Sequence, residues 1–106
     1  LNGDDLFRIK SARGADAKGM IISEGFAVLK GSVIASTTTL GMSSSMISLR
    51  EKLLKNAVVN ENYEFVSDFI FNSPSLAAAI VMGRNANGKT EWKNHNGENI
   101  NDIEVK

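Results

Sequence analysis

One segment of the sequence, residues 73–83, constrains the fold more than any other. Ser73 can cap a helix, and Pro74 can take its first position, where a missing N–H costs nothing. The run that follows, Leu-Ala-Ala-Ala-Ile-Val-Met, is apolar on almost every side of a helix, and Gly83 can end it. A helix that is apolar all round is buried. The segment therefore predicts a largely buried helix, whose three alanines would let a neighbouring element approach closely.

The rest of the chain predicts short strands and one more helix. Alternating side chains indicate strands at 6–10, 19–23 and 26–30, with Glu24-Gly25 as a hairpin turn. An amphipathic pattern predicts a helix at about 45–56, after a Ser/Thr/Gly-rich loop.

Two C-terminal segments complete the expected fold. Residues 63–71 predict a strand pair or one bent strand, and His95-Asn96-Gly97 predicts a hairpin between strands at 90–94 and 98–100. The last residues, 99–105, fit either a helical turn or a strand. The expected fold is α+β: a small antiparallel sheet of hairpins packed with two helices, at about 45–56 and 74–83, in one domain over 1–106.

Composition excludes several classes of function. The chain of 106 residues has no cysteine and one histidine, His95, which excludes disulfides, thiolate metal sites and a cysteine nucleophile. Twelve basic and twelve acidic residues give a net charge of zero. Neither a signal peptide nor a membrane-spanning run is visible, so we expect a cytoplasmic protein that does not enter membranes. Because the chain starts at Leu1 and not at a methionine, we expect an excised domain of a longer protein.

The motifs give little support for an enzyme. Asp68 with Glu91 and Lys93 imitates the D…ExK spacing of metal-dependent restriction-type nucleases, although solvated surface residues produce the same spacing. The chain has no nucleophile elbow and no glycine-rich phosphate loop. We therefore expect no catalytic residues, no metal and no cofactor.

Basic and amide side chains offer more for binding. The cations gather before and after the predicted N-terminal hairpin (Arg8, Lys10, Arg13, Lys18, Lys30) and around the last hairpin (Arg84, Lys89, Lys93). If the acids lie elsewhere, such cations form a face that can neutralise phosphates. Asn85 and Asn87 can pair with base edges or simply make turns, and Trp92 can stack on a base or fill the core.

Five strings of the sequence, taken in order, carry a family resemblance. They are Ser-Ala-Arg-Gly-Ala-Asp-Ala at 11–17, Gly-Phe-Ala-Val-Leu-Lys-Gly-Ser at 25–32, Phe-Asn-Ser-Pro-Ser-Leu-Ala-Ala at 71–78, Gly-Arg-Asn-Ala-Asn-Gly at 83–88 and Glu-Trp-Lys at 91–93. Together they resemble a bacterial domain of unknown function that is found C-terminal to GIY-YIG nuclease domains. Three of their elements, Ser-Pro-Ser with Ala-Ala at 73–78, Asn-Gly at 87–88 and Trp92, are also similar to the RAMA domains, which are proposed to recognise modified adenine in DNA and are linked to restriction–modification systems.

The resemblance implies a non-catalytic DNA-recognition or targeting module that works beside a nuclease domain in the same polypeptide. Its expected partner is duplex DNA, and the similarity to RAMA domains extends this expectation to duplex DNA with modified adenine. The residues expected to contact phosphates are Arg13, Lys30, Arg84 and Lys89, with Asn85 and Asn87 at base edges, Trp92 stacking or supporting the loop, and a phosphate at the helix N-terminus of Ser73 and Ser75. Lys89 departs from the family, which usually has an aromatic residue there. The alternative is an interaction or structural module that docks on the nuclease domain.

Overall fold

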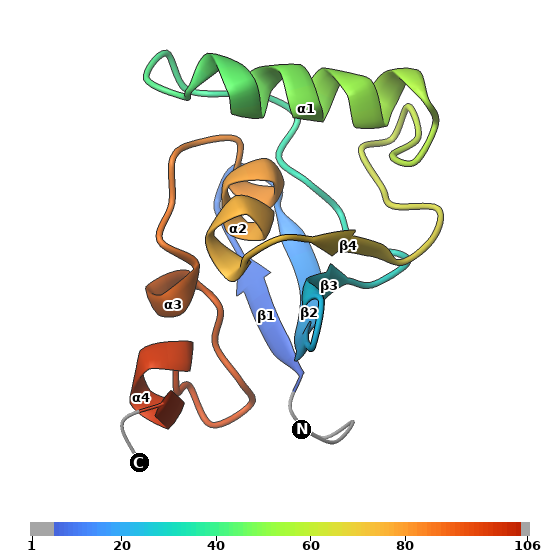
Figure 1. The fold of residues 1–106 in the computed structure, drawn as a ribbon. Helices are drawn as coiled ribbons and strands as arrows, with labels where there is room; N and C mark the ends of the chain where they lie inside the picture. Colours follow the sequence, from blue (N-terminus) through green and yellow to red (C-terminus); the bar gives the residue numbers. More distant parts are fainter. Residues whose placement is uncertain (1–5, 105–106) are drawn as a thin grey trace.

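The computed structural model describes residues 6–104, which form one α+β domain built on a four-stranded antiparallel sheet (Figure 1). The strands, in the spatial order β1-β2-β3-β4, are β1 (Phe7–Lys10), β2 (Asp16–Ile22), β3 (Gly25–Val28) and β4 (Phe69–Phe71). The helices are α1 (Ser44–Lys55), α2 (Pro74–Met82), α3 (Gly88–Glu91) and α4 (Ile100–Glu104). The predicted fold class is confirmed. None of the described helices is long and apolar enough to cross a membrane.

The predicted N-terminal meander is present, but β2 begins earlier than expected. It starts at Asp16, three residues before the predicted strand, and it pairs with β1 through Phe7↔Gly19 and Lys10↔Asp16. Alanine is a weak strand former, so the local pattern does not reveal these first residues. Pairing with β1 holds them in the sheet, and there Ala17 points into the core with 0% exposure.

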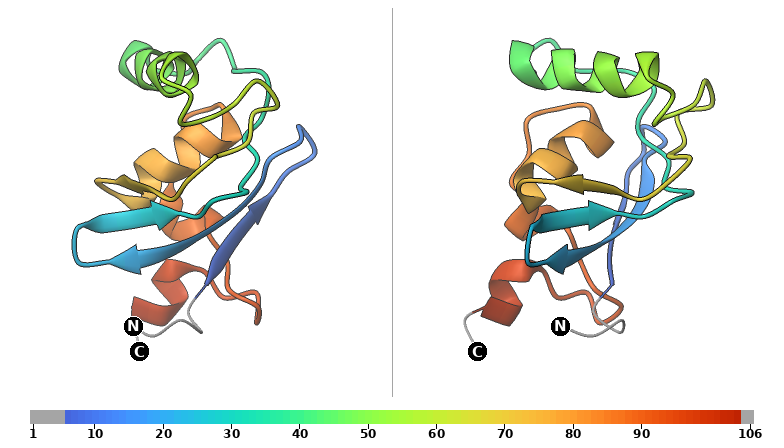
Figure 2. Two further views of the ribbon diagram at one scale, coloured as in Figure 1. Left: turned by 90° about the vertical axis from the view of Figure 1, so that its right-hand side faces the viewer. Right: turned by 45° about the vertical axis from the view of Figure 1, so that its right-hand side comes forward.

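The buried helix predicted from residues 73–83 lies at the centre of the molecule. Figure 2 shows α2 between the sheet and α1, so that the layers run sheet, α2, α1. The Ser73 hydroxyl accepts a hydrogen bond from the Leu76 backbone N–H at 3.1 Å, and Pro74 takes the first helical position. Gly83 ends the helix in the left-handed conformation at φ 68°. Residues 77–82 are all buried, as the apolar run requires.

Two arginines from distant segments hold the C-terminal end of α2. Arg13 Nη1 donates to the Met82 carbonyl oxygen at 3.1 Å, and Arg50 Nη1 donates to that of Ile80 at 3.1 Å. Arg50 Nη2 donates to the Ala35 carbonyl oxygen. The last carbonyls of a helix lack partners within the helix and carry partial negative charge. The buried Arg50 and the exposed Arg13 satisfy these carbonyls.

The C-terminal hairpin is only partly as predicted. Its turn exists, since the Asn94 backbone N–H donates to the Glu98 carbonyl oxygen at 2.9 Å and Lys93 forms a bridge with Asn99. The expected strand at 90–94 is wrong at its start, because residues 88–91 form α3. Asn87 caps this short helix, and its side-chain oxygen accepts from the Lys89 backbone N–H at 3.0 Å. Residues 100–104, left open between helix and strand, are helical.

Residues 63–71, predicted as a strand pair or one bent strand, form two short separate extended pieces. Only 69–71 join the sheet as β4, while Glu64 and Phe65 form isolated bridges with Val33 and Val59. The aromatic side chains of this segment still face the core, and the rings of Phe69 and Phe71 lie 4.9 Å apart.

Candidate nucleic-acid interface

One face of the sheet carries none of the described helices. Helix α2 packs on the other face, and α1 packs in turn on α2 (Figure 2). Side chains of β1 alternate accordingly: Phe7 and Ile9 are buried, and Arg8 and Lys10 are exposed. This uncovered side of β1 and β2 is called the open face below.

A row of three cations crosses the open face. Arg8 on β1 stands in register with Lys18 on β2, and on its other side it forms an antiparallel bridge with Lys93. All three side chains are exposed. Within residues 6–104 none of them forms an ion pair, whereas Arg84 and Lys89 do. Among the described residues, the row therefore presents three positive charges side by side without an ion-pair partner.

The cation row lines a hollow of about 850 Å³. Its lining residues are Leu6, Phe7, Arg8, Lys18, Lys93, Asn94 and His95. The described lining holds no carboxylate, and the acid nearest in register, Asp16, stands opposite Lys10 further along the strands. An anion entering this hollow meets three cations and no fixed negative charge among the lining groups.

Lys30 lies next to this row. The Leu29 backbone N–H donates to the Lys18 carbonyl oxygen at 2.9 Å, and Lys30 and Lys18 share a smaller hollow of about 340 Å³ with Asp16. The Lys30 side chain is exposed, so the predicted phosphate contact at this residue stays a prediction.

Arg13 and Arg84, which were also expected to contact phosphates, already bind to other groups of the protein. Arg13 donates to carbonyl oxygens of Met82 and Thr37 and to the Thr37 hydroxyl. Arg84 pairs with Glu91 at 3.4 Å and donates to the Asn85 carbonyl oxygen at 3.2 Å. A phosphate at either arginine would have to compete with these bonds.

The amides expected at base edges are also engaged. Asn85 bridges to the loop before α1: its Nδ2 donates to the Gly41 carbonyl oxygen at 2.8 Å, and its Oδ1 accepts from the Ser43 N–H at 3.2 Å. Asn87 caps α3, and the Lys89 ammonium pairs with Glu104 at 3.0 Å. These residues fix loops against each other.

Trp92 belongs to the core. It has 0% exposure, its ring centroid lies 4.5 Å from that of Phe26, and its indole N–H donates to the Pro74 carbonyl oxygen at 3.0 Å. Of the two roles expected for Trp92, supporting the loop fits this position, and stacking on a base does not.

The N-terminus of α2, the expected phosphate site, is in contact with α3. The Ser75 hydroxyl accepts from the Gly88 backbone N–H at 2.9 Å, while Ser73 caps its own helix. Gly88 approaches so closely that an added Cβ would lie 2.1 Å from the Pro74 carbonyl carbon. Ser73 and Ser75 thus position α3 in the fold.

The three residues of the nuclease-like pattern are not brought together. Asp68 accepts from the Lys30 backbone N–H at 2.7 Å, just before the edge strand β4. Lys93 lies beyond β1, at the opposite edge of the sheet, and Glu91 pairs with Arg84. From the Lys93 segment across β1, β2 and β3 to β4 there are four steps between neighbouring strands, a distance of about 19 Å. Within residues 6–104 no three His, Asp or Glu side chains are grouped to hold a metal ion.

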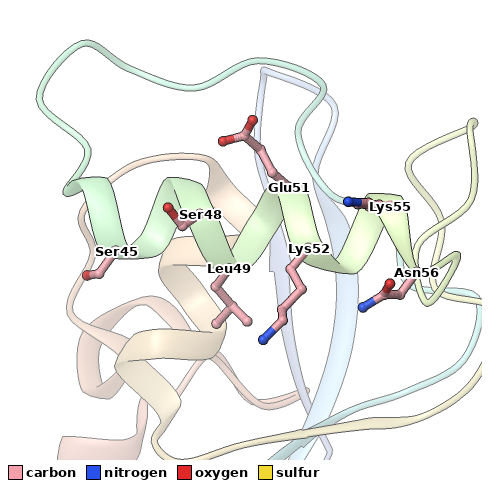
Figure 3. A pocket seen from close by; sticks show the side chains of 7 residues that line it. All are labelled: Ser45, Ser48, Leu49, Glu51, Lys52, Lys55 and Asn56. Atoms are coloured by element: carbon pink, nitrogen blue, oxygen red, sulfur yellow. The ribbon is translucent and has the colours of Figure 1, made fainter.

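A second hollow, of about 600 Å³, runs along α1 and its C-cap. It is lined by Ser45, Ser48, Leu49, Glu51, Lys52, Lys55 and Asn56. Figure 3 shows that these side chains leave one helix in different directions, with Glu51 pointing away from Leu49 and Lys52. This hollow mixes both charges and collects groups from a single element, so the open face is the better candidate.

The cations identified in the sequence include Arg8, Lys18 and Lys93, but the residues predicted to contact DNA do not. The signal that could have found them is the alternation of β1 combined with its register against β2.

Comparison with known proteins gives a family and no function. Residues 7–104 match the model of DUF4357, described as a domain of unknown function. No curated protein and no solved structure matches the chain.

Proposed function

This chain belongs to the DUF4357 family of domains of unknown function, and we propose that it is a non-catalytic accessory module that binds duplex DNA. The row of Lys93, Arg8 and Lys18 contacts phosphates and holds the DNA for an enzyme domain in the same polypeptide. The observation that carries this proposal is the row itself: three exposed cations in register, unpaired within the described chain, lining one hollow without a described carboxylate.

Electrostatics sets the strength of this binding. Each phosphate contact releases counterions, so three contacts give a slope of about −2.7 for log K against log salt. The chain as a whole is neutral, which removes long-range attraction. Binding by the isolated domain is therefore weak, and tethering to a second DNA-contacting domain raises the effective affinity. The resemblance to nuclease-associated domains supports this arrangement.

The test is a pair of charge-matched variants. Arg8→Gln/Lys18→Gln removes two cations of the row, and Lys52→Gln/Lys55→Gln removes two exposed cations of α1, which packs on the far side of α2. Fluorescence anisotropy with a labelled 20-base-pair duplex, measured over a series of salt concentrations, should give the α1 variant the wild-type slope. The row variant should fall to about −0.9. Equal loss in both variants would contradict the proposal.

One observation favours the alternative, a module that docks on a neighbouring domain. Ile70 on β4 is 51% exposed and Val66 is 45% exposed, at the edge of the sheet away from the cation row. Exposed apolar groups at a sheet edge suit a protein contact. If this alternative holds, the chain binds no duplex at low salt, associates with the neighbouring domain, and loses that association on Ile70→Lys.

A further inference from the structure

Resting on the DNA-binding role proposed above, we infer that the open face recognises the phosphate backbone of duplex DNA and does not read adenine or its methylation. Three features carry the inference: the spacing of the cation row, the place of every aromatic ring, and the bonds already made by the asparagine amides.

The cation row is compact. Lys93, Arg8 and Lys18 stand on adjacent chain segments of one sheet. Neighbouring strands lie about 4.8 Å apart, so the backbone positions of the row span about 10 Å. Three long cationic side chains this close together suit several neighbouring phosphates of one stretch of DNA, which is recognition of the backbone.

No Phe, Tyr or Trp ring is available on the open face to hold a base. All seven such residues of the chain fall within the described residues. Five of them are at most 2% exposed: Phe7, Phe26, Phe65, Phe71 and Trp92. Phe69 is in register with the buried Val28 and so faces the core, and the Tyr63 ring lies 5.9 Å from the Arg50 guanidinium. Stacking on a Phe, Tyr or Trp ring, the usual means of holding an extruded or single-stranded base, has no platform here.

The amides that could identify adenine are occupied. A side-chain amide reads adenine through a donor and an acceptor used together. Asn85 uses both groups on the backbone of the loop before α1, and Asn87, which lies outside the hollow, uses its acceptor on the Lys89 backbone N–H. Asn94, the one amide lining the hollow, donates to Glu98 at 3.2 Å and accepts from the backbone N–H groups of Asn96 and Glu98 at 3.0 Å each. The other polar side chains that line the hollow are the three cations of the row and the His95 imidazole, and these groups suit phosphates.

The experiment compares three ligands on the full chain: a duplex with central adenines, the same duplex with N6-methyladenine, and the single strand alone. Anisotropy at low salt should give dissociation constants for the two duplexes within about twofold of each other, and weaker binding of the single strand because its charge density is lower. Asn87→Ser, which keeps a capping hydroxyl, should bind the plain duplex within about twofold of wild type.

The outcomes separate the two proposals. Binding that prefers the methylated duplex by fivefold or more, or that is lost in Asn87→Ser while the variant stays folded, overturns the inference and leaves DNA binding standing. A flat titration with every ligand overturns the proposed function, and the inference falls with it. Tighter binding of the single strand also contradicts the inference, because it requires a stacking surface on the protein.

Discussion

At the scale of single residues, Arg50 shows how the fold uses charge away from the surface. It is 4% exposed, and within residues 6–104 it has no carboxylate partner. Burial lowers the pKa of its guanidinium. Its N–H groups instead donate to the carbonyl oxygens of Ile80 on α2 and of Ala35 in the loop before α1. The guanidinium also lies over the ring of Tyr63. A fork of several N–H donors is needed to join two segments in this way, and arginine provides it.

Arg50→Lys is therefore expected to destabilise the protein although it keeps the charge. A single ammonium cannot span both carbonyl positions, so at least one buried carbonyl loses its partner. Urea denaturation should show a loss of about 2 kcal/mol. The matched control is the reverse exchange at an exposed position of the same helix, Lys52→Arg, which should stay within about 0.5 kcal/mol of wild type. Equal stability of the two variants would contradict this role for Arg50.

At the scale of elements, α3 is the piece that ties the C-terminal segment to α2. Its four residues are too short to be stable alone. Three contacts hold it: the Gly88 N–H bonds to Ser75, the Trp92 indole bonds to Pro74, and the Gly88 backbone lies directly against the first turn of α2. Lys93 follows at once and joins β1. The docking of α3 thus sets the position of one cation of the row.

Gly88→Ala is expected to force α3 off α2. The new methyl group would lie about 2 Å from Pro74 backbone atoms, which cannot move without shifting the helix. We expect a loss of about 3 kcal/mol in stability and a red-shifted Trp92 fluorescence as the indole meets water. Gly41→Ala is the control, because an added Cβ there meets nothing within 4 Å and its φ is not in the left-handed range. Unchanged fluorescence in Gly88→Ala would contradict the close docking of α3.

Elements and site differ in how far they could be predicted from sequence. Helix α2 was predictable because its cap, its proline and its terminal glycine are local signals. The candidate site was not predictable, because it depends on which cations form ion pairs or hydrogen bonds within the folded protein. Arg8 and Arg13 are five residues apart and chemically identical, yet strand alternation turns Arg8 outward, while Arg13 reaches the end of α2. That difference rests on tertiary contacts, which no local pattern reports.

At the scale of the whole molecule, neutrality is an average over unlike faces. The twelve basic and twelve acidic residues cancel in the sum, but the fold pairs Arg84 and Lys89 with acids, buries Arg50 and binds Arg13 to backbone carbonyl oxygens. It leaves Lys93, Arg8 and Lys18 together on the face that no helix covers. A neutral chain thus presents one local positive surface, which is the central claim of the proposed function.

The most direct test of that claim is a nuclear magnetic resonance titration of the ¹⁵N-labelled chain with an unlabelled duplex at low salt. The predicted result is a set of amide shift changes concentrated in β1, the Lys18 region of β2 and residues 93–95, with α1 unchanged. Shifts centred on the 84–89 loop or on α1, or no shifts at a saturating concentration of duplex, would contradict it.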